Sequence, residues 1–447
     1  MSMLVLAHAI GGVKDLPIPG QFFLYGGGAV LGLSFIALGV LWSEPHLEDA
    51  DRGRALRPRL QRLVLSRALR VVFGAVGTAL FVLVLAAGWS GSQDPDGNIA
   101  PTAVWVLFWL GLVWVSLLVG NVWSILSPLR AIADAVAWLA RPLRWRTRPY
   151  PERLGWWPAA ALFFAVAAME LISSHPSDPR NVAAGASLYA AITWAGMSVF
   201  GRRAWLENGE TFNVYFGLFA RMAPFEIRGE GDERRRVVVR PPFVGLSKWR
   251  PGPGAVAMVA VMLGSVGFDS VTRTSAWRSF RAESLTAEST RVPVELGLMT
   301  ACVCFVAFAY LLAVWFAKRF TDGDVVLWPR FLASLVPIAL VYSIAHYVSL
   351  LVGFSQLAIP LASDPFGHGW NLFGSAGWEP NLKPLTSHEI WYVQTATLVG
   401  GHVVGLSLAH DRSVKLFRGG DVLRSQYVML TLMVIYTVGG LYLLSRP

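Results

Sequence analysis

Long runs of apolar residues alternate along the chain with shorter polar segments, and the runs have the length of membrane-crossing helices. About 20 helical residues, each adding 1.5 Å, cross the ~30 Å hydrocarbon core of a bilayer. The pattern therefore predicts an all-α fold, a polytopic membrane bundle of about ten transmembrane helices. The expected spans are residues 20–42, 70–89, 102–125, 155–173, 181–201, 253–270, 293–316, 329–353, 389–409 and 426–444.

The composition also indicates a membrane protein. Of the 447 residues, 54% are hydrophobic and only 15% are charged, whereas soluble proteins contain about 25% charged residues. The formal net charge of +10 is strongly basic, but no nucleic-acid-binding motif accompanies it. We therefore expect the lipid bilayer as the partner and no nucleic acid.

The arginines are distributed unequally between alternate loops. Segments 43–69, 126–154 and 202–252 are rich in arginine, whereas 90–101 contains no basic residue and 354–388 contains one lysine. Basic loops stay on the cytoplasmic side of a membrane, so the alternation predicts an external N-terminus. The abundance of Arg, Ala, Val and Gly is typical of a GC-rich bacterial genome, and we expect a multi-pass protein of the bacterial plasma membrane.

The same pattern divides the chain into four parts. They are an external tail at 1–19, five spans within 20–204, a cytoplasmic interfacial segment at 205–250, and five spans within 251–447 with an external loop at 354–388. The tail contains His8 and Asp15, and two interpretations stay open for it: a flexible start that the first span orders, or a segment folded over the outer mouth of the bundle. In the loop, the rings of Trp370, Phe373 and Trp378 are expected to pack over the same mouth.

The interfacial segment contains an apolar helical face. Its members recur at steps of three and four residues: Phe212, Tyr215, Phe216, Phe219 and Met222. A helix lying in the inner interface is the favoured interpretation, and a re-entrant segment is the alternative. The arginines that follow at 234–236, with those of the other cytoplasmic loops, are expected to meet anionic lipid headgroups.

Several ionisable residues fall inside or at the ends of the predicted spans. Counting from the span ends places Glu170, Asp269 and His346 in the outer third of the bundle. His388 and Glu389 open the ninth span at the outer surface, and His402 lies deeper. Ionisable groups in lipid are costly, so each needs a partner or a function. We expect His346 to be neutral, in one polar cluster with His402 or Glu170, and the triplet 410–412 to lie at a solvated inner boundary.

These residue types are the usual ligands of zinc. Three imidazoles are the candidate metal ligands, namely His346, His388 and His402, and three carboxylates are the candidate catalytic groups, namely Glu170, Asp269 and Glu389. A bound divalent metal such as zinc would lower the pKa of a water molecule toward 7. The alternative for each histidine is a neutral ring that is hydrogen-bonded inside the bundle.

Three stretches resemble one family. The tail "HAIGGVKDLPIP", the segment "GETFNVYFGLFARMAPF" and the closing "GHVVGLSLAHDR" are similar to actinobacterial multi-pass membrane proteins named fenitrothion hydrolase. The resemblance implies a membrane-bound organophosphate triester hydrolase, and it carries over no catalytic residue. Together with the candidate ligands above, it favours a membrane-embedded, metal-dependent hydrolase of lipophilic phosphotriester-like or ester substrates. Two other functions stay open, namely a transporter or channel that uses the intramembrane His and Glu residues, and a membrane scaffold that docks partners on 205–250.

Overall fold

The computed structural model describes residues 20–50, 52–140, 146–229, 235–321 and 325–444. The predicted tail at 1–19, with His8 and Asp15, lies outside the described residues. The described chain is helical almost throughout, so the predicted all-α class is confirmed.

Eight of the ten expected spans are long and apolar enough to cross a membrane. They are built on α2 (Gly20–Leu41), α4 and α5 (Pro58–Val64, Arg67–Ser90), α6, η2 and α7 (Ile99–Pro101, Thr102–Gly111, Leu112–Val119), α11 (Pro179–Phe200), α14 (Ala255–Thr272), α16 (Glu288–Ala317), α18 (Leu335–Phe354) and α22 (Tyr427–Leu444). The expected spans at 155–173 and 389–409 correspond to α10 (Trp157–Leu171), which is shorter, and α20 (Ser387–Leu416), which is long but less apolar.

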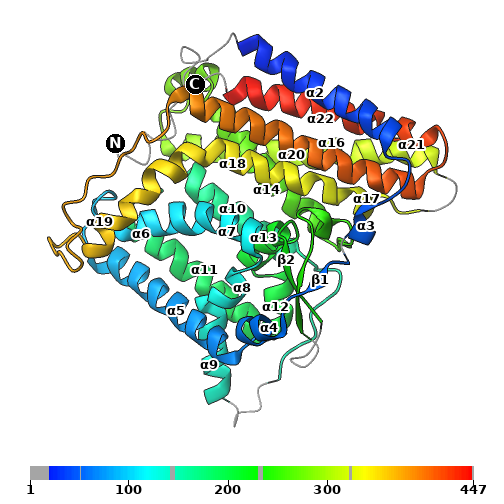
Figure 1. Ribbon diagram of the computed structural model, residues 1–447. Helices are drawn as coiled ribbons and strands as arrows, with labels where there is room; N and C mark the ends of the chain where they lie inside the picture. Colours follow the sequence, from blue (N-terminus) through cyan, green and yellow to red (C-terminus); the bar gives the residue numbers. More distant parts are fainter. Residues whose placement is uncertain (1–19, 51, 141–145, 230–234, 322–324, 445–447) are drawn as a thin grey trace.

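Two helices form the centre of the bundle. In the most apolar 18-residue stretch of α14 and of the span that contains α18, 72% of the residues are buried within the protein, against 39% or less in the corresponding stretches of the other candidate spans. Figure 1 shows α2, α22, α20 and α16 running side by side along one side, with α5 and α11 on the opposite side. Close approach of α20 to α18 depends on Gly401, since a Cβ at that position would lie 2.3 Å from the Val341 side chain.

The loops fall into two sets, as the alternation of arginines requires. At one end, Ser92 N–H donates to the Phe366 carbonyl at 2.7 Å, which joins the loops at 91–98 and 364–386. At the other end, β1 (Arg54–Ala55), β3 (Arg236–Val239) and β2 (Phe225–Arg228) form an antiparallel sheet in the order β1-β3-β2. The sheet, which the sequence did not predict, joins two arginine-rich loops.

Helix α13 (Thr211–Ala220) departs from the favoured interfacial interpretation. Its expected apolar face is present, but Val214 and Leu218 on other faces are also buried. No charged residue occurs between Glu210 and Arg221, so no side of the helix favours water. The helix instead packs inside the bundle against α7, α10 and α18, as in the re-entrant alternative.

The loop predicted to be external, 354–388, also differs from expectation. Trp370 packs beside Phe366 and His368, with ring centroids 5.5 and 5.3 Å apart. The predicted cover of aromatic rings over the bundle is nevertheless wrong, because Phe373 is 76% exposed and Trp370 is 44% exposed.

Candidate functional site

The two central helices meet through a histidine and a carboxylate. His346 on α18 and Asp269 on α14 are buried, and His346 Nε2 lies 2.5 Å from Asp269 Oδ2. The neighbouring Tyr347 hydroxyl lies 3.4 Å from the same oxygen. A proton must lie between Nε2 and Oδ2, because both atoms would otherwise present lone pairs at hydrogen-bonding distance.

Arg273 compensates the charge of this carboxylate. One turn after Asp269 on α14, its Nε donates to Oδ1 at 3.1 Å and its Nη2 donates to Oδ2 at 2.7 Å. Both Asp269 oxygens are thus held in a two-pronged ion pair. Since buried carboxylates need a partner charge, this pair explains how Asp269 is accommodated near the end of a central helix.

A second carboxylate lies beside the pair. Glu170, from the last turn of α10, interacts electrostatically with both Asp269 and Arg273. His346 therefore shares one polar cluster with Glu170, as the depth count predicts, and Asp269 is its direct partner. This cluster, namely Glu170, Asp269, Arg273, His346 and Tyr347, is called the outer cluster below.

Two hydroxyls extend the outer cluster toward α13. The Tyr215 side chain interacts with that of Ser343 and, electrostatically, with Glu170. Ser343 lies three residues before His346 on α18, and its own Oγ donates to the Ala339 carbonyl at 3.2 Å. The Tyr215 ring is buried among aromatic neighbours, with the Phe163 ring 4.8 Å away. The sequence interpretation missed this role of Tyr215 because it placed α13 at the membrane surface.

The other sequence-predicted site residues lie elsewhere. His402 is buried on α20, where its Nδ1 lies 2.8 Å from the Leu398 carbonyl and its ring meets that of Tyr342 edge-on. His388 and Glu389 are exposed at the start of α20. Glu389 accepts from Thr386 N–H at 2.8 Å and forms a capping box, so its observed contacts are those of a helix cap.

The expected metal centre is therefore not assembled. Within the described ranges, no group of three or more His, Cys, Asp and Glu side chains could hold a metal ion. The three predicted ligands His346, His388 and His402 have separate surroundings, and zinc sites need three or four convergent donors. Of the six predicted site residues, Glu170, Asp269 and His346 come together, as their similar depth along the spans predicted. The other three lie elsewhere.

A buried carboxylate at the start of α13 was also missed. Glu210, fully buried at the N-cap of α13, accepts from Trp123 Nε1 at 3.1 Å, from the Tyr189 hydroxyl, and from the backbone of Asn213 at 2.7 Å. A negative side chain directly before a helix is favoured by the helix dipole, which gave a signal for this position. These donors fix the start of α13 inside the bundle.

The triplet 410–412 is buried rather than solvated. Asp411 accepts from Trp42 Nε1 at 3.1 Å and from the backbone of His46 at 2.7 Å, and Arg412 donates to Glu48 at 2.9 Å. Burial raises the pKa of Glu48, but contact with Lys415 and Arg412 outweighs it and holds that pKa below its ordinary value. These contacts attach the segment after α2 to the end of α20.

Comparisons with models of known families, with curated proteins and with solved structures find no match to this chain.

Proposed function

We propose that the protein moves protons, alone or coupled to a substrate, across a bacterial plasma membrane, and that the outer cluster is its proton-exchange site. The observation that carries this proposal is the 2.5 Å contact between His346 and Asp269 on the two central helices. Ionisable side chains inside a membrane bundle are characteristic of proton relays and transport paths. Metal-dependent hydrolysis is less well supported, because the candidate ligands do not converge.

The charges of the outer cluster allow two electrically balanced forms. Asp269 and Arg273 neutralise each other, so the balance is set by Glu170 and His346. The cluster is neutral when Glu170 is protonated and His346 is neutral, and again when Glu170 is ionised and His346 is protonated. Transfer of a proton between these two side chains would therefore leave no net charge in a medium of low dielectric constant. Asp269 connects them, because it contacts His346 and interacts electrostatically with Glu170.

The cluster has contacts toward both ends of the bundle. Arg273 lies one turn beyond Asp269, about 6 Å closer to the end of α14, and its side chain is 25% exposed. Ser343 lies about 4.5 Å from His346 in the opposite sense along α18, and its partner Tyr215 continues the chain of hydroxyls. Hydroxyl groups can accept and donate a proton at once, so they suit a relay.

Membrane orientation is part of the proposal. The arginine-rich end, with the sheet β1-β3-β2, would face the cytoplasm and contact anionic headgroups. Helix α9 (Pro128–Leu139) supports this placement, since it belongs to the arginine-rich segment 126–154 and its Trp138 and Leu139 are 60% and 69% exposed. Reporter fusions should place Gly97 outside and Gly229 inside, and the reverse result would contradict the orientation.

Proton movement is testable in liposomes. The purified protein would be reconstituted with a pH-sensitive dye inside, and a potassium diffusion potential would drive protons across the membrane. We expect flux above that of protein-free liposomes and loss of most of it in His346→Gln. The matched control is His402→Gln, another buried histidine on a neighbouring helix, which should keep the flux. Equal flux in the wild type and in His346→Gln would contradict the proposal.

A further inference from the structure

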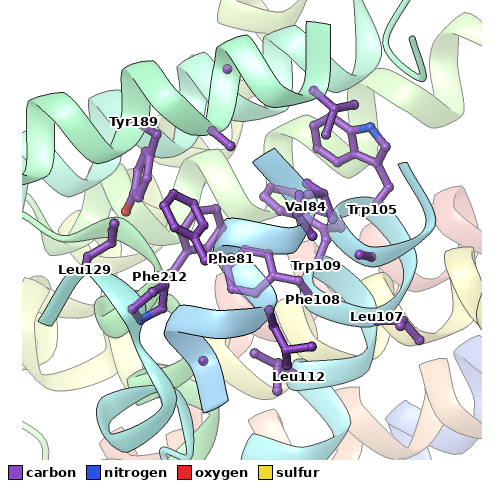
Figure 2. A pocket seen from close by; sticks show the side chains of 18 of the residues that line it. Phe81, Val84, Trp105, Leu107, Phe108, Trp109, Leu112, Leu129, Tyr189 and Phe212 are labelled. Atoms are coloured by element: carbon purple, nitrogen blue, oxygen red, sulfur yellow. The ribbon is translucent and has the colours of Figure 1, made fainter. Parts of the chain in front are cut away.

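An apolar cavity of about 350 Å³ lies among α5, η2, α7, α10 and α11, with Phe212 from α13 at one end. Its size falls in the range of ligand sites, roughly 300–1,000 Å³. In Figure 2 the rings of Phe81, Phe108 and Trp109 occupy the middle of the view, and the Tyr189 hydroxyl points from α11 toward the side where Leu129 and Phe212 lie. The lining side chains are otherwise aliphatic or aromatic, and their polar atoms are the Tyr189 hydroxyl, the indole N–H groups of three tryptophans and the Met169 sulfur.

The position of the rim indicates how a ligand would enter. Leu80 and Leu107 line the cavity and are also 53% and 38% exposed. Leu80 is near the middle of α5, and Leu107 is near the middle of the span formed by α6, η2 and α7. Since both helices are long enough to cross the bilayer, the opening lies at the depth of lipid hydrocarbon chains rather than of headgroups.

The polar groups at the closed end are already paired. The Tyr189 hydroxyl and Trp123 Nε1 both donate to Glu210, which is fully buried. A polar headgroup placed at this end would therefore find no free hydrogen-bond donor. Burying it would cost free energy, because no hydrogen bond would replace those it makes with water. The cavity is therefore suited to a ligand portion that needs no hydrogen bonds.

The wall provides an independent sign of a specialised site. The ten residues of η2, Thr102–Gly111, form a π-helix and contribute Trp105, Leu107, Phe108 and Trp109 to the lining. π-Helices are rare and usually limited to a single turn, and they occur frequently at functional sites. Here the unusual helix faces the cavity directly.

We propose that this cavity binds a hydrocarbon chain of a bilayer lipid, which enters sideways between Leu80 and Leu107. A chain in the cavity would restore the van der Waals contacts that an empty apolar space forfeits. This proposal does not depend on proton movement by the outer cluster. The two sites are neighbours, however, because α10 contributes Met169 to the cavity and Glu170 to the cluster.

The test uses the full-length protein in liposomes of phosphatidylcholine that carries a photoactivatable diazirine near the end of one acyl chain. After irradiation, mass spectrometry of peptides locates the labelled residues. We expect labels on inward-facing lining residues such as Phe81 and Phe108. Two variants should lower that labelling about tenfold, because a larger side chain in a packed wall excludes the ligand: Ala186→Phe inside the cavity and Leu107→Trp at its rim.

The matched control is Leu118→Trp. Leu118 lies on α7, is 60% exposed and is not part of the lining, so this variant should label the cavity as the wild type does. Absence of label from Phe81 and Phe108 in the wild type would overturn the proposal. So would cavity labelling that stays unchanged in both Ala186→Phe and Leu107→Trp. If neither variant yields monodisperse protein on size exclusion, the wild-type labelling map alone decides the question.

Discussion

The pairing of Asp269 with Arg273 predicts a measurable coupling between the two side chains. Asp269→Asn keeps the shape of the side chain but removes its charge, and Arg273→Gln removes the charge of its partner with a shorter polar side chain. Loss of one member of a buried ion pair costs about 3–5 kcal/mol because the other charge is left without compensation. The Arg273 side chain is 25% exposed, so water screens part of this effect, and we expect each single variant to lose about 2 kcal/mol.

The double variant Asp269→Asn/Arg273→Gln should lose less than the sum of the two single variants. Removing both charges leaves neither uncompensated, and neighbours in one network typically show a coupling of about 0.5–3 kcal/mol. Unfolding in mixed micelles titrated with a denaturing detergent gives the free energy of unfolding for all four proteins. Additive losses, or single variants as stable as the wild type, would refute the assignment of this pair as a compensated buried charge.

Three further predictions concern other parts of the fold. Thr386→Ala, which breaks the cap of α20, should lower stability by about 1 kcal/mol and leave proton flux unchanged; a large flux loss would give the start of α20 a functional role. Because the pKa of Glu48 is lower in the folded protein, its stabilising contribution is present above its unfolded pKa and is lost as the pH falls through the folded pKa. The Tm of the wild type should therefore fall more steeply on acidification below about pH 4.5 than that of Glu48→Gln, and parallel curves would contradict this account. Phe216→Ala should lower the free energy of unfolding by about 3–5 kcal/mol, because the ring is fully buried. The control is Phe225→Ala, which should be tolerated because that side chain is 37% exposed. If Phe216→Ala is tolerated as well, α13 does not pack inside the bundle and the interfacial interpretation is the better one.

Hydropathy and depth were sufficient to predict the spans and part of the site. Apolar runs reveal where a helix can cross lipid, and counting residues along them placed Glu170, Asp269 and His346 at one level. Counting gives no information on which helices are neighbours or which way a side chain faces. For that reason His402, on a neighbouring helix, was grouped with His346, although its ring meets Tyr342 instead.

The sequence interpretation missed three residues for other reasons, which concern the packing and the length of the helices. Tyr215 and Glu210 belong to a segment whose aromatic face resembled a surface helix, and only its packing shows that the remaining faces are buried too. Arg273 falls three residues beyond the expected span 253–270 and was not among the candidate site residues. Its contact with Asp269 depends on α14 continuing to Thr272, which keeps both residues on one helical face.

A proton shared between Glu170 and His346 is tested most directly by infrared difference spectroscopy of the reconstituted protein during a pH change. The wild type should show the carbonyl stretch of a protonated carboxyl group that disappears in Glu170→Gln. In His346→Gln the band should persist to higher pH, because Glu170 then has no imidazole to receive its proton. A band that titrates identically in the wild type and in His346→Gln, or that is unaffected by Glu170→Gln, would contradict proton exchange within the outer cluster.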